Sequence, residues 1–240
     1  MSVADYLVVA AAVVAASCLQ ASIGFGMGML AAPVVAMVDP TLIPGTLIMW
    51  AILVTLLVTV RERKHVDLTG TGWALLGRVP GTVAGALLVA MLPPRGLALM
   101  LAGVVLVGVA LTSFGWAPQP HRSNLVAAGA ASGLLGTATS IGGPPMALVW
   151  QRNTGAALRG TMSGFFLVGS TFSLLMLAVT GSVDQRTLLT FVLLLPAPVA
   201  GYVLSRYVNR FLDPRRLRRT AITVSVCGAL VLVGQQVAAL

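Results

Sequence analysis

The sequence predicts an all-α, polytopic membrane protein made of two inverted repeats, each a broken helical hairpin followed by three transmembrane helices. Three observations carry this prediction: an apolar composition, eight long apolar blocks, and a duplication whose loops have opposite charge bias. Of the 240 residues, 58% are hydrophobic and only 9% are charged, and the mean hydropathy is +0.96. One soluble domain cannot bury so many apolar side chains, so a water-soluble enzyme is excluded.

The elements follow from runs long enough to cross a hydrocarbon core of about 30 Å, which takes roughly 20 helical residues. In chain order these blocks span approximately Val3–Val38, Leu42–Val60, Gly72–Leu92, Leu97–Phe114, Leu125–Trp150, Gly160–Thr180, Leu188–Tyr207 and Ala221–Leu240. The first block is too long for one straight span, and Gly142, Gly143, Pro144 and Pro145 interrupt the fifth. Both therefore predict hairpins or paired half-helices, and the other blocks predict single spans.

An internal repeat divides the chain into residues 1–120 and 121–240, which together predict one membrane domain. Four short matches occur in the same order at nearly one spacing, which indicates a duplication. The matched pairs are Ala21-Ser22-Ile23-Gly24 with Thr139-Ser140-Ile141-Gly142, Val66-Asp67 with Val183-Asp184, Pro80–Gly85 with Pro196–Gly201, and Leu92–Arg95 with Leu212–Arg215.

The loop charges predict that the two repeats lie upside down to each other. Cytoplasmic loops collect Lys and Arg, and the loop after the second block carries Arg61, Arg63 and Lys64, whereas its repeat partner carries only Arg186. The bias is reversed after the seventh block, where the loop is rich in Arg and its partner has only Arg95. Opposite bias in equivalent loops is typical of inverted repeats. The topology that follows is a multi-pass protein of the cell (plasma) membrane with both termini outside.

The same loops explain the net charge of +9, which otherwise would suggest nucleic-acid binding. We expect the lipid bilayer, and no nucleic acid, as the partner of these basic residues. Cys18 and Cys227 both lie in apolar runs and predict packing residues instead of a disulfide framework or a metal site. His65 and His121 lie in predicted loops, which leaves no histidine for an intramembrane protease or a haem. No enzyme, cofactor or metal is expected.

The two interrupted blocks are the candidate binding site, because irregular backbone at membrane depth needs burial in protein or a polar cavity. After each break a new helical arm begins, and its N–H groups and positive dipole end favour an anion. Side-chain hydroxyls and glycines at the breaks would bind the ligand. The candidate residues, with Arg78 added, are Gln20, Ser22, Gly24, Gly26, Arg78, Thr137, Thr139, Ser140, Gly142 and Gly143. The alternative is that these glycines only allow close helix packing.

Arg78 lies within the third block, roughly 12 Å into the membrane from a cytoplasmic start near Gly70. No acidic residue is predicted in the neighbouring spans to neutralise it. Two interpretations stand side by side: Arg78 binds the anion, or it reaches back to the cytoplasmic headgroups. Trp50, in the middle of its span, likewise either lines the pathway or packs in the core.

Two glycine-rich motifs stand at the breaks. The first is Gln20-Ala21-Ser22-Ile23-Gly24-Phe25-Gly26 followed by Pro33, and the second is Ser132-Gly133-Leu134-Leu135-Gly136 leading to Gly142-Gly143-Pro144-Pro145, with Arg159-Gly160-Thr161 beyond. In these motifs, and over nearly its whole length, the sequence resembles the sulfite exporter TauE/SafE family of membrane transporters. The resemblance implies transport of small sulfur-containing or organic anions such as sulfite, sulfonates or thiosulfate. The chain departs from the commoner Gly-Gly-Gly form of these motifs at Phe25, Met27 and Pro144.

The protein is therefore predicted to be a membrane transporter that exports a small anionic substrate, which binds near the bilayer midplane. The six acidic residues all lie in predicted termini or loops, so no carboxylate relay for protons is expected in the membrane. The membrane potential is then the simplest driving force for export. Two alternatives remain, a passive anion channel and a membrane scaffold or accessory subunit that transports nothing.

Overall fold

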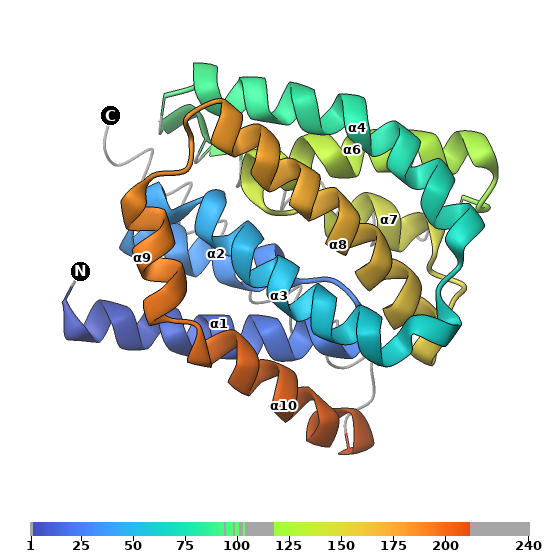
Figure 1. Ribbon diagram of the computed structural model, residues 1–240, viewed down its shortest axis with the longest axis horizontal. Coiled ribbons are helices and arrows are strands. Elements are labelled where there is room, and N and C mark those ends of the chain that lie inside the picture. Colours follow the sequence, from blue (N-terminus) through green and yellow to red (C-terminus); the bar gives the residue numbers. More distant parts are fainter. Residues whose placement is uncertain (1, 94, 98, 101–102, 104–117, 212–240) are drawn as a thin grey trace.

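A computed structural model describes residues 2–93, 95–97, 99, 100, 103 and 118–211 of the chain. Over these residues the chain is helical and contains no strand, which confirms the predicted all-α fold (Figure 1). Most of the fourth predicted block, all of the eighth, and Cys227 lie outside the described residues. The helices are α1 (Val3–Ile23), α2 (Met27–Val38), α3 (Gly45–Glu62), α4 (Leu68–Met91), α6 (Arg122–Thr139), α7 (Gly143–Val149), α8 (Gly155–Val179), α9 (Gln185–Leu193) and α10 (Pro196–Phe211).

Both interrupted blocks are broken helices, as their glycines predict. Gly24, directly after α1, has a φ of +89°, and Gly26 follows with a φ of +122°. Ser140, directly after α6, lies in the same left-handed region, with a φ of +64°. Left-handed backbone terminates a helix, and glycine adopts it without a Cβ penalty. The chain resumes as α2 at Met27 and as α7 at Gly143.

The seventh block, predicted as a single span over Leu188–Tyr207, consists of two helices, a break that the prediction did not include. α9 and α10 meet at an angle of 44°, and Leu194 and Leu195 form the turn between them. Pro196 is the first residue of α10. Its ring has no N–H and disfavours helical backbone at the preceding residue, which accounts for the bend.

Close backbone contacts join helices from the two halves of the chain. A Cβ at Gly77 or Gly81 of α4 would overlap a carbonyl oxygen of α6, and a Cβ at Gly129 of α6 would overlap a carbonyl oxygen of α4. Small residues let membrane helices approach in this way. α10 packs on α1 through Gly201, where a Cβ would overlap the carbonyl oxygen of Val14.

α3 crosses the middle of the molecule between α1 and α8 (Figure 1). Glu62, the last residue of α3, bonds to Arg159 near the start of α8. Gly45, the first residue of α3, lies against Ser182 and Val183, which follow the end of α8. α3 and α8 are therefore antiparallel neighbours, one from each half.

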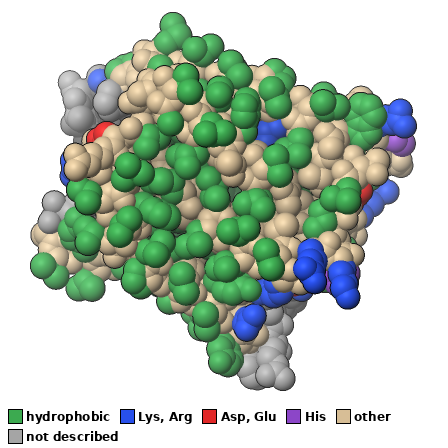
Figure 2. All heavy atoms as spheres, in the orientation of Figure 1, with side chains coloured by type: hydrophobic (Ala, Val, Ile, Leu, Met, Phe, Trp, Pro, Cys, Tyr) green, Lys and Arg blue, Asp and Glu red, His purple; other side chains and the backbone are tan. Residues whose placement is uncertain are grey.

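The outer surface suits lipid. Within the described residues, α1, α3, α4 and α8 are long and apolar enough to cross a membrane, and the bent α9–α10 pair adds a span if it counts as one. Large apolar side chains such as Leu7, Leu87, Leu175 and Val192 are exposed. Figure 2 shows apolar side chains spread over the visible face, with many of the Lys and Arg side chains gathered towards the end where α3 terminates. This surface confirms the predicted polytopic membrane protein.

Candidate functional site

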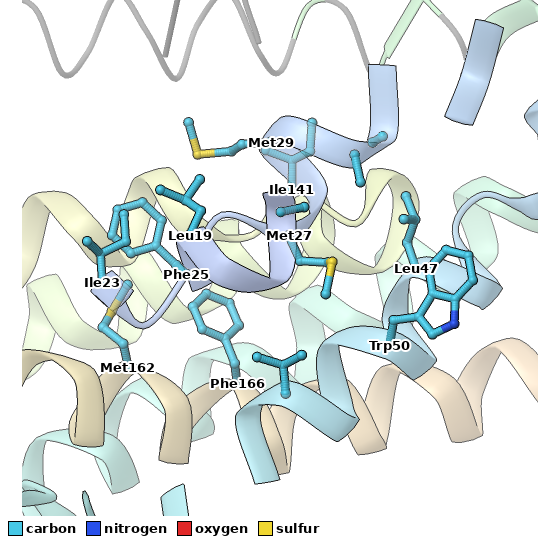
Figure 3. Packing of buried hydrophobic residues seen from close by; sticks show 14 of the residues in the cluster. Leu19, Ile23, Phe25, Met27, Met29, Leu47, Trp50, Ile141, Met162 and Phe166 are labelled. Atoms are coloured by element: carbon cyan, nitrogen blue, oxygen red, sulfur yellow. The ribbon is translucent and has the colours of Figure 1, made fainter. Parts of the chain in front are cut away.

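The two helix breaks meet inside the protein. A Cβ at Gly28, in the first turn of α2, would overlap the carbonyl oxygen of Ser140 in the second break. A Cβ at Gly143 would lie 2.7 Å from the ring of Phe25 in the first break. Figure 3 shows Phe25 and Met27 close to Ile141, with Phe166 of α8 nearby. Segments more than 100 residues apart in sequence are thus in contact at the breaks.

A small cavity lies where the breaks meet, with a volume of about 30 Å³, or room for roughly two water molecules. Glycines from both breaks, apolar side chains and a few polar groups line it. The lining residues are Gln20, Phe25, Gly26, Met27, Gly28, Met29, Ile48, Ala51, Arg78, Gly136, Ser140, Ile141, Gly142, Gly143, Phe166 and Ser170.

Arg78 provides the positive charge in the lining of this cavity. Its side chain is only 2% exposed, so the guanidinium does not extend to the surface of the described molecule. Its Cζ lies 4.8 Å from the ring centroid of Phe165 and 5.3 Å from that of Phe166. A Cβ at Gly169 would overlap Arg78 Nε, so this glycine provides the space that the side chain occupies.

Ser132 holds one end of the guanidinium. Arg78 Nη1 donates to Ser132 Oγ at 2.9 Å, and Ser132 Oγ donates in turn to the carbonyl oxygen of Gly142 at 2.7 Å. One hydroxyl therefore links α4, α6 and the second break. Arg78 Nε has no hydrogen-bond partner within the described part of the chain. The guanidinium is consequently oriented but incompletely satisfied.

No carboxylate pairs with Arg78 among the described residues, because all five described acidic side chains serve helix ends. Asp5 accepts from the backbone N–H of Ser2, the residue before α1, and Asp67 and Asp184 accept from N–H groups in the first turns of α4 and α9. Asp39 pairs with Arg186, and Glu62 pairs with arginines of α3 and α8. A buried guanidinium without a counter-ion is costly, by about 2.5–3.5 kcal/mol on membrane-insertion scales, and a bound anion would offset this cost.

Gln20 bridges the first break. Its Oε1 accepts from the backbone N–H of Met27 at 3.0 Å, and its Nε2 donates to the carbonyl oxygen of Ala51 at 3.2 Å. The side chain thereby satisfies a free N–H at the start of α2 and attaches the break to α3. Gln20 therefore lines the cavity while both ends of its amide are engaged in structural hydrogen bonds.

The second break offers few backbone donors. α7 has only seven residues, and Pro144 and Pro145 in its first turn carry no N–H. Ser140 donates its hydroxyl to the carbonyl oxygen of Pro44 at 3.1 Å. The positive group in this part of the cavity is accordingly the guanidinium of Arg78.

Six of the ten residues predicted for the site line the cavity: Gln20, Gly26, Arg78, Ser140, Gly142 and Gly143. The other four do not. Ser22 donates to the carbonyl oxygen of Cys18 at 2.7 Å, and Thr139 donates to that of Leu135 at 2.7 Å. The Thr137 hydroxyl pairs with that of Ser173 at 2.8 Å, and Gly24 packs against the backbone of Arg159.

Sequence reasoning missed the side chains that hold Arg78. Phe165 and Phe166 lie in an apolar span, where an aromatic pair gives no signal that separates cavity from core. Ser132 belongs to the Ser132–Gly136 motif, but nothing in that motif links its hydroxyl to Arg78, and Ser170, which lines the cavity, is a single hydroxyl within a helix. Trp50 is fully buried, and its indole N–H points to the carbonyl oxygen of Phe191 at 3.4 Å. It is absent from the cavity lining, which supports the core-packing interpretation.

No curated protein and no solved structure matches the chain. The sequence does match the family model for the sulfite exporter TauE/SafE over residues 8–232. That match extends over nearly the whole chain and includes both helix breaks and Arg78, and the chain therefore belongs to the TauE/SafE family of sulfite exporters, which are membrane transporters.

Proposed function

We propose that this protein exports a small sulfur-containing or organic anion, such as sulfite, a sulfonate or thiosulfate, and that Arg78 binds it. The observation that carries the proposal is a buried guanidinium in a cavity between two helix breaks, with no carboxylate partner in the described structure. An anion would neutralise this charge and accept from the unpartnered Nε. Arginine suits such a ligand because its planar fork donates two parallel hydrogen bonds to an oxyanion.

The surroundings of Arg78 favour a compact ligand. The faces of two phenyl rings lie against the guanidinium and hold it by cation–π attraction, worth about 2 kcal/mol when desolvated, but they leave its charge uncancelled. The cavity has room for roughly two water molecules, so a larger organic anion requires the walls to move apart. The glycines of both breaks bring backbone close to the bound anion.

Two structural features support the inverted repeats and the topology. Gly85 of α4 packs against Thr137 of α6, and its repeat equivalent Gly201 of α10 packs against Ser17 of α1. α3 and α8, the equivalent helices after each break, run antiparallel. With the basic loops inside, the Glu62 end of α3 faces the cytoplasm and both termini lie outside.

The membrane potential is sufficient to drive export in this proposal. A singly charged anion gains about 2.3 kcal/mol per 100 mV on leaving a cell that is negative inside, and a doubly charged one gains about twice that. The described cavity lining contains no carboxylate that would carry a coupled proton. We therefore expect flux to depend on the potential and not to require a proton or sodium gradient.

The test is anion flux in proteoliposomes, with sulfite, thiosulfate and a sulfonate as substrates and a potassium–valinomycin gradient setting the potential. We expect saturable, potential-driven flux from the wild type and counterflow on addition of unlabelled anion. Saturation without counterflow would indicate a channel. The absence of any flux would support a scaffold and contradict the proposal.

Variants of Arg78 test the binding residue. Arg78→Gln removes the charge and should abolish flux, and Arg78→Lys keeps the charge without the planar fork and should lower the affinity at least tenfold. Arg152→Gln, in an exposed loop, is the matched control and should behave as the wild type. Normal affinity and flux in Arg78→Gln at equal expression would show that Arg78 is not the ligand.

A further inference from the structure

Two groups of charged side chains join the halves of the protein at opposite ends of α3. The Glu62 clasp consists of Glu62, Arg61 and Arg159, and the Asp39 clasp consists of Asp39 and Arg186. We propose that these clasps are the two gates of the transport path, and that each opens one side of the cavity in turn. This inference rests on the proposed transport function but not on Arg78 as the ligand.

The Glu62 clasp closes the first break. Glu62 is only 8% exposed, and its Oε1 accepts from Arg159 Nε at 3.1 Å, from Arg159 Nη2 at 2.9 Å and from Arg61 Nε at 3.1 Å. Arg61 Nη2 also donates to the carbonyl oxygen of Ala21, near the end of α1, at 3.1 Å. A Cβ at Gly24 would lie 3.2 Å from Arg159 Cα, so the break itself packs against the clasp. The ends of α1 and α3 and the start of α8 are fastened together here.

The Asp39 clasp lies at the other end of α3, in the segment that leads from α2 into α3. Asp39 follows α2, and its Oδ2 accepts from Arg186 Nη2 in the first turn of α9. Its Oδ1 accepts from the backbone N–H and the hydroxyl of Thr41, at 3.1 and 2.6 Å. The Ser140 hydroxyl of the second break bonds to the carbonyl oxygen of Pro44, directly before α3. This end of α3 is thus fastened to α9 and to the second break.

The cavity lies between the two clasps. α3 has 18 residues, so its ends are about 27 Å apart, and Ile48 and Ala51 within it line the cavity. Each clasp pairs a carboxylate from the first half with an arginine from the second half. The halves cannot separate at either end until the pair at that end breaks, and alternating access in inverted repeats needs such a movement.

The two clasps differ in their exposure to solvent. The Arg186 side chain is 55% exposed, whereas those of Arg61, Arg159 and Glu62 are 21%, 22% and 10% exposed. The carboxylates of Glu62 and Asp39 are about equally buried, at 10% and 9% exposed, so the difference lies in the arginines. Solvent screens the exposed Arg186, whereas Arg61 and Arg159 are less exposed and lose more when the carboxylate is removed. Loss of the Glu62 clasp should therefore have the larger effect on opening.

A cysteine at Ala51 reports on both gates, in a background with Cys18→Ala and Cys227→Ala. Its labelling by an impermeant thiol reagent is compared in sealed vesicles of the two orientations. Glu62→Gln should raise the labelling rate at least tenfold from one side, and Asp39→Asn should raise it by a smaller factor from the other. Asp67→Asn and Asp184→Asn, which affect helix caps at the same two ends, are the controls and should leave both rates unchanged.

Two further variants separate gating from misfolding. Arg159→Gln removes the cross-half pair but keeps the bond between Glu62 and Arg61, and it should open the same side as Glu62→Gln. The exchange Glu62→Arg with Arg159→Glu restores the pair and should return labelling towards the wild-type rate. Unchanged labelling in both Glu62→Gln and Arg159→Gln, or equal increases from both sides of the membrane, would overturn the proposal. Because the labelling experiment uses no anion, it tests the gates independently of the proposed role of Arg78 in binding.

Discussion

Arg78 is held by contacts from two other helices, and each contact acts on a different part of the side chain. Ser132 of α6 bonds to Nη1, the rings of Phe165 and Phe166 of α8 face the guanidinium, and Gly169 of α8 leaves space beside Nε. The guanidinium direction is therefore fixed before an anion arrives. Such preorganisation reduces the ordering cost of binding.

Ser132→Ala should weaken anion binding about tenfold, or roughly 1.4 kcal/mol, because Arg78 Nη1 and the Gly142 carbonyl both lose their partner. The measurement is the KM for sulfite flux together with the rise in melting temperature on adding sulfite. Ser163→Ala is the matched control, since the buried Ser163 hydroxyl has no hydrogen-bond partner in the described structure. Equal KM values in the two variants would refute the orienting role of Ser132.

At the scale of elements, α4 is one continuous helix where its repeat equivalent is broken. Pro80 lies inside a continuous α4, whereas the equivalent Pro196 begins a new helix. Gly77 and Gly81 flank Pro80 and allow α4 to contact the backbone of α6 on both sides of the proline. The equivalent residues beside Pro196 are larger, Leu193 and Ala197, and permit no such contact. Close packing of α4 against α6 keeps Arg78 directed at the cavity.

Gly81→Ala should lower the melting temperature in detergent by several degrees, because its Cβ would overlap the Ala130 carbonyl oxygen and push α4 away from α6. Gly72→Ala, in the first turns of the same helix, has no atom within 4 Å of the new Cβ. This control should melt at the wild-type temperature or slightly above, since alanine favours helix. A Gly81→Ala protein as stable as the control would show that α4 and α6 are not in backbone contact.

At the scale of the whole molecule, contacts between the halves dominate the packing of the described helices. α4 of the first half lies on α6 of the second, α10 of the second lies on α1 of the first, and α3 pairs with α8. Each half thus completes the other. The cavity belongs to neither alone, because Gln20 and Arg78 line it from the first half and Ser170 from the second.

Single cysteines test the orientation of the assembled molecule, in a background without Cys18 and Cys227. Lys64→Cys and Arg152→Cys should react with impermeant reagents only from the cytoplasm, and Gln185→Cys only from outside, since basic loops stay inside. All three positions are exposed. Labelling of Lys64→Cys and Gln185→Cys from the same side would contradict the inverted topology.

The sequence by itself determined the features that depend on composition and on local backbone. An apolar excess requires a membrane, and glycine clusters around Gly24 and Gly142 predict the breaks because helix termination is a local event. Arg78 was identifiable as a candidate because an arginine is rare in an apolar run. The bend before Pro196 was missed because a proline alone does not decide whether a helix breaks: Pro80 lies inside a helix that continues.

Only the tertiary structure decided which polar groups surround the cavity. A hydroxyl inside a helix can bond to its own backbone, as Ser22 and Thr139 do, or to another helix, as Ser132 does, and sequence does not distinguish the two. The bond from Arg78 to Ser132 joins residues 54 positions apart, and the Glu62 and Arg159 pair joins residues 97 apart. Such contacts depend on how helices from opposite halves pack, because glycines set the distance between backbones and packing sets which face of each helix points inward.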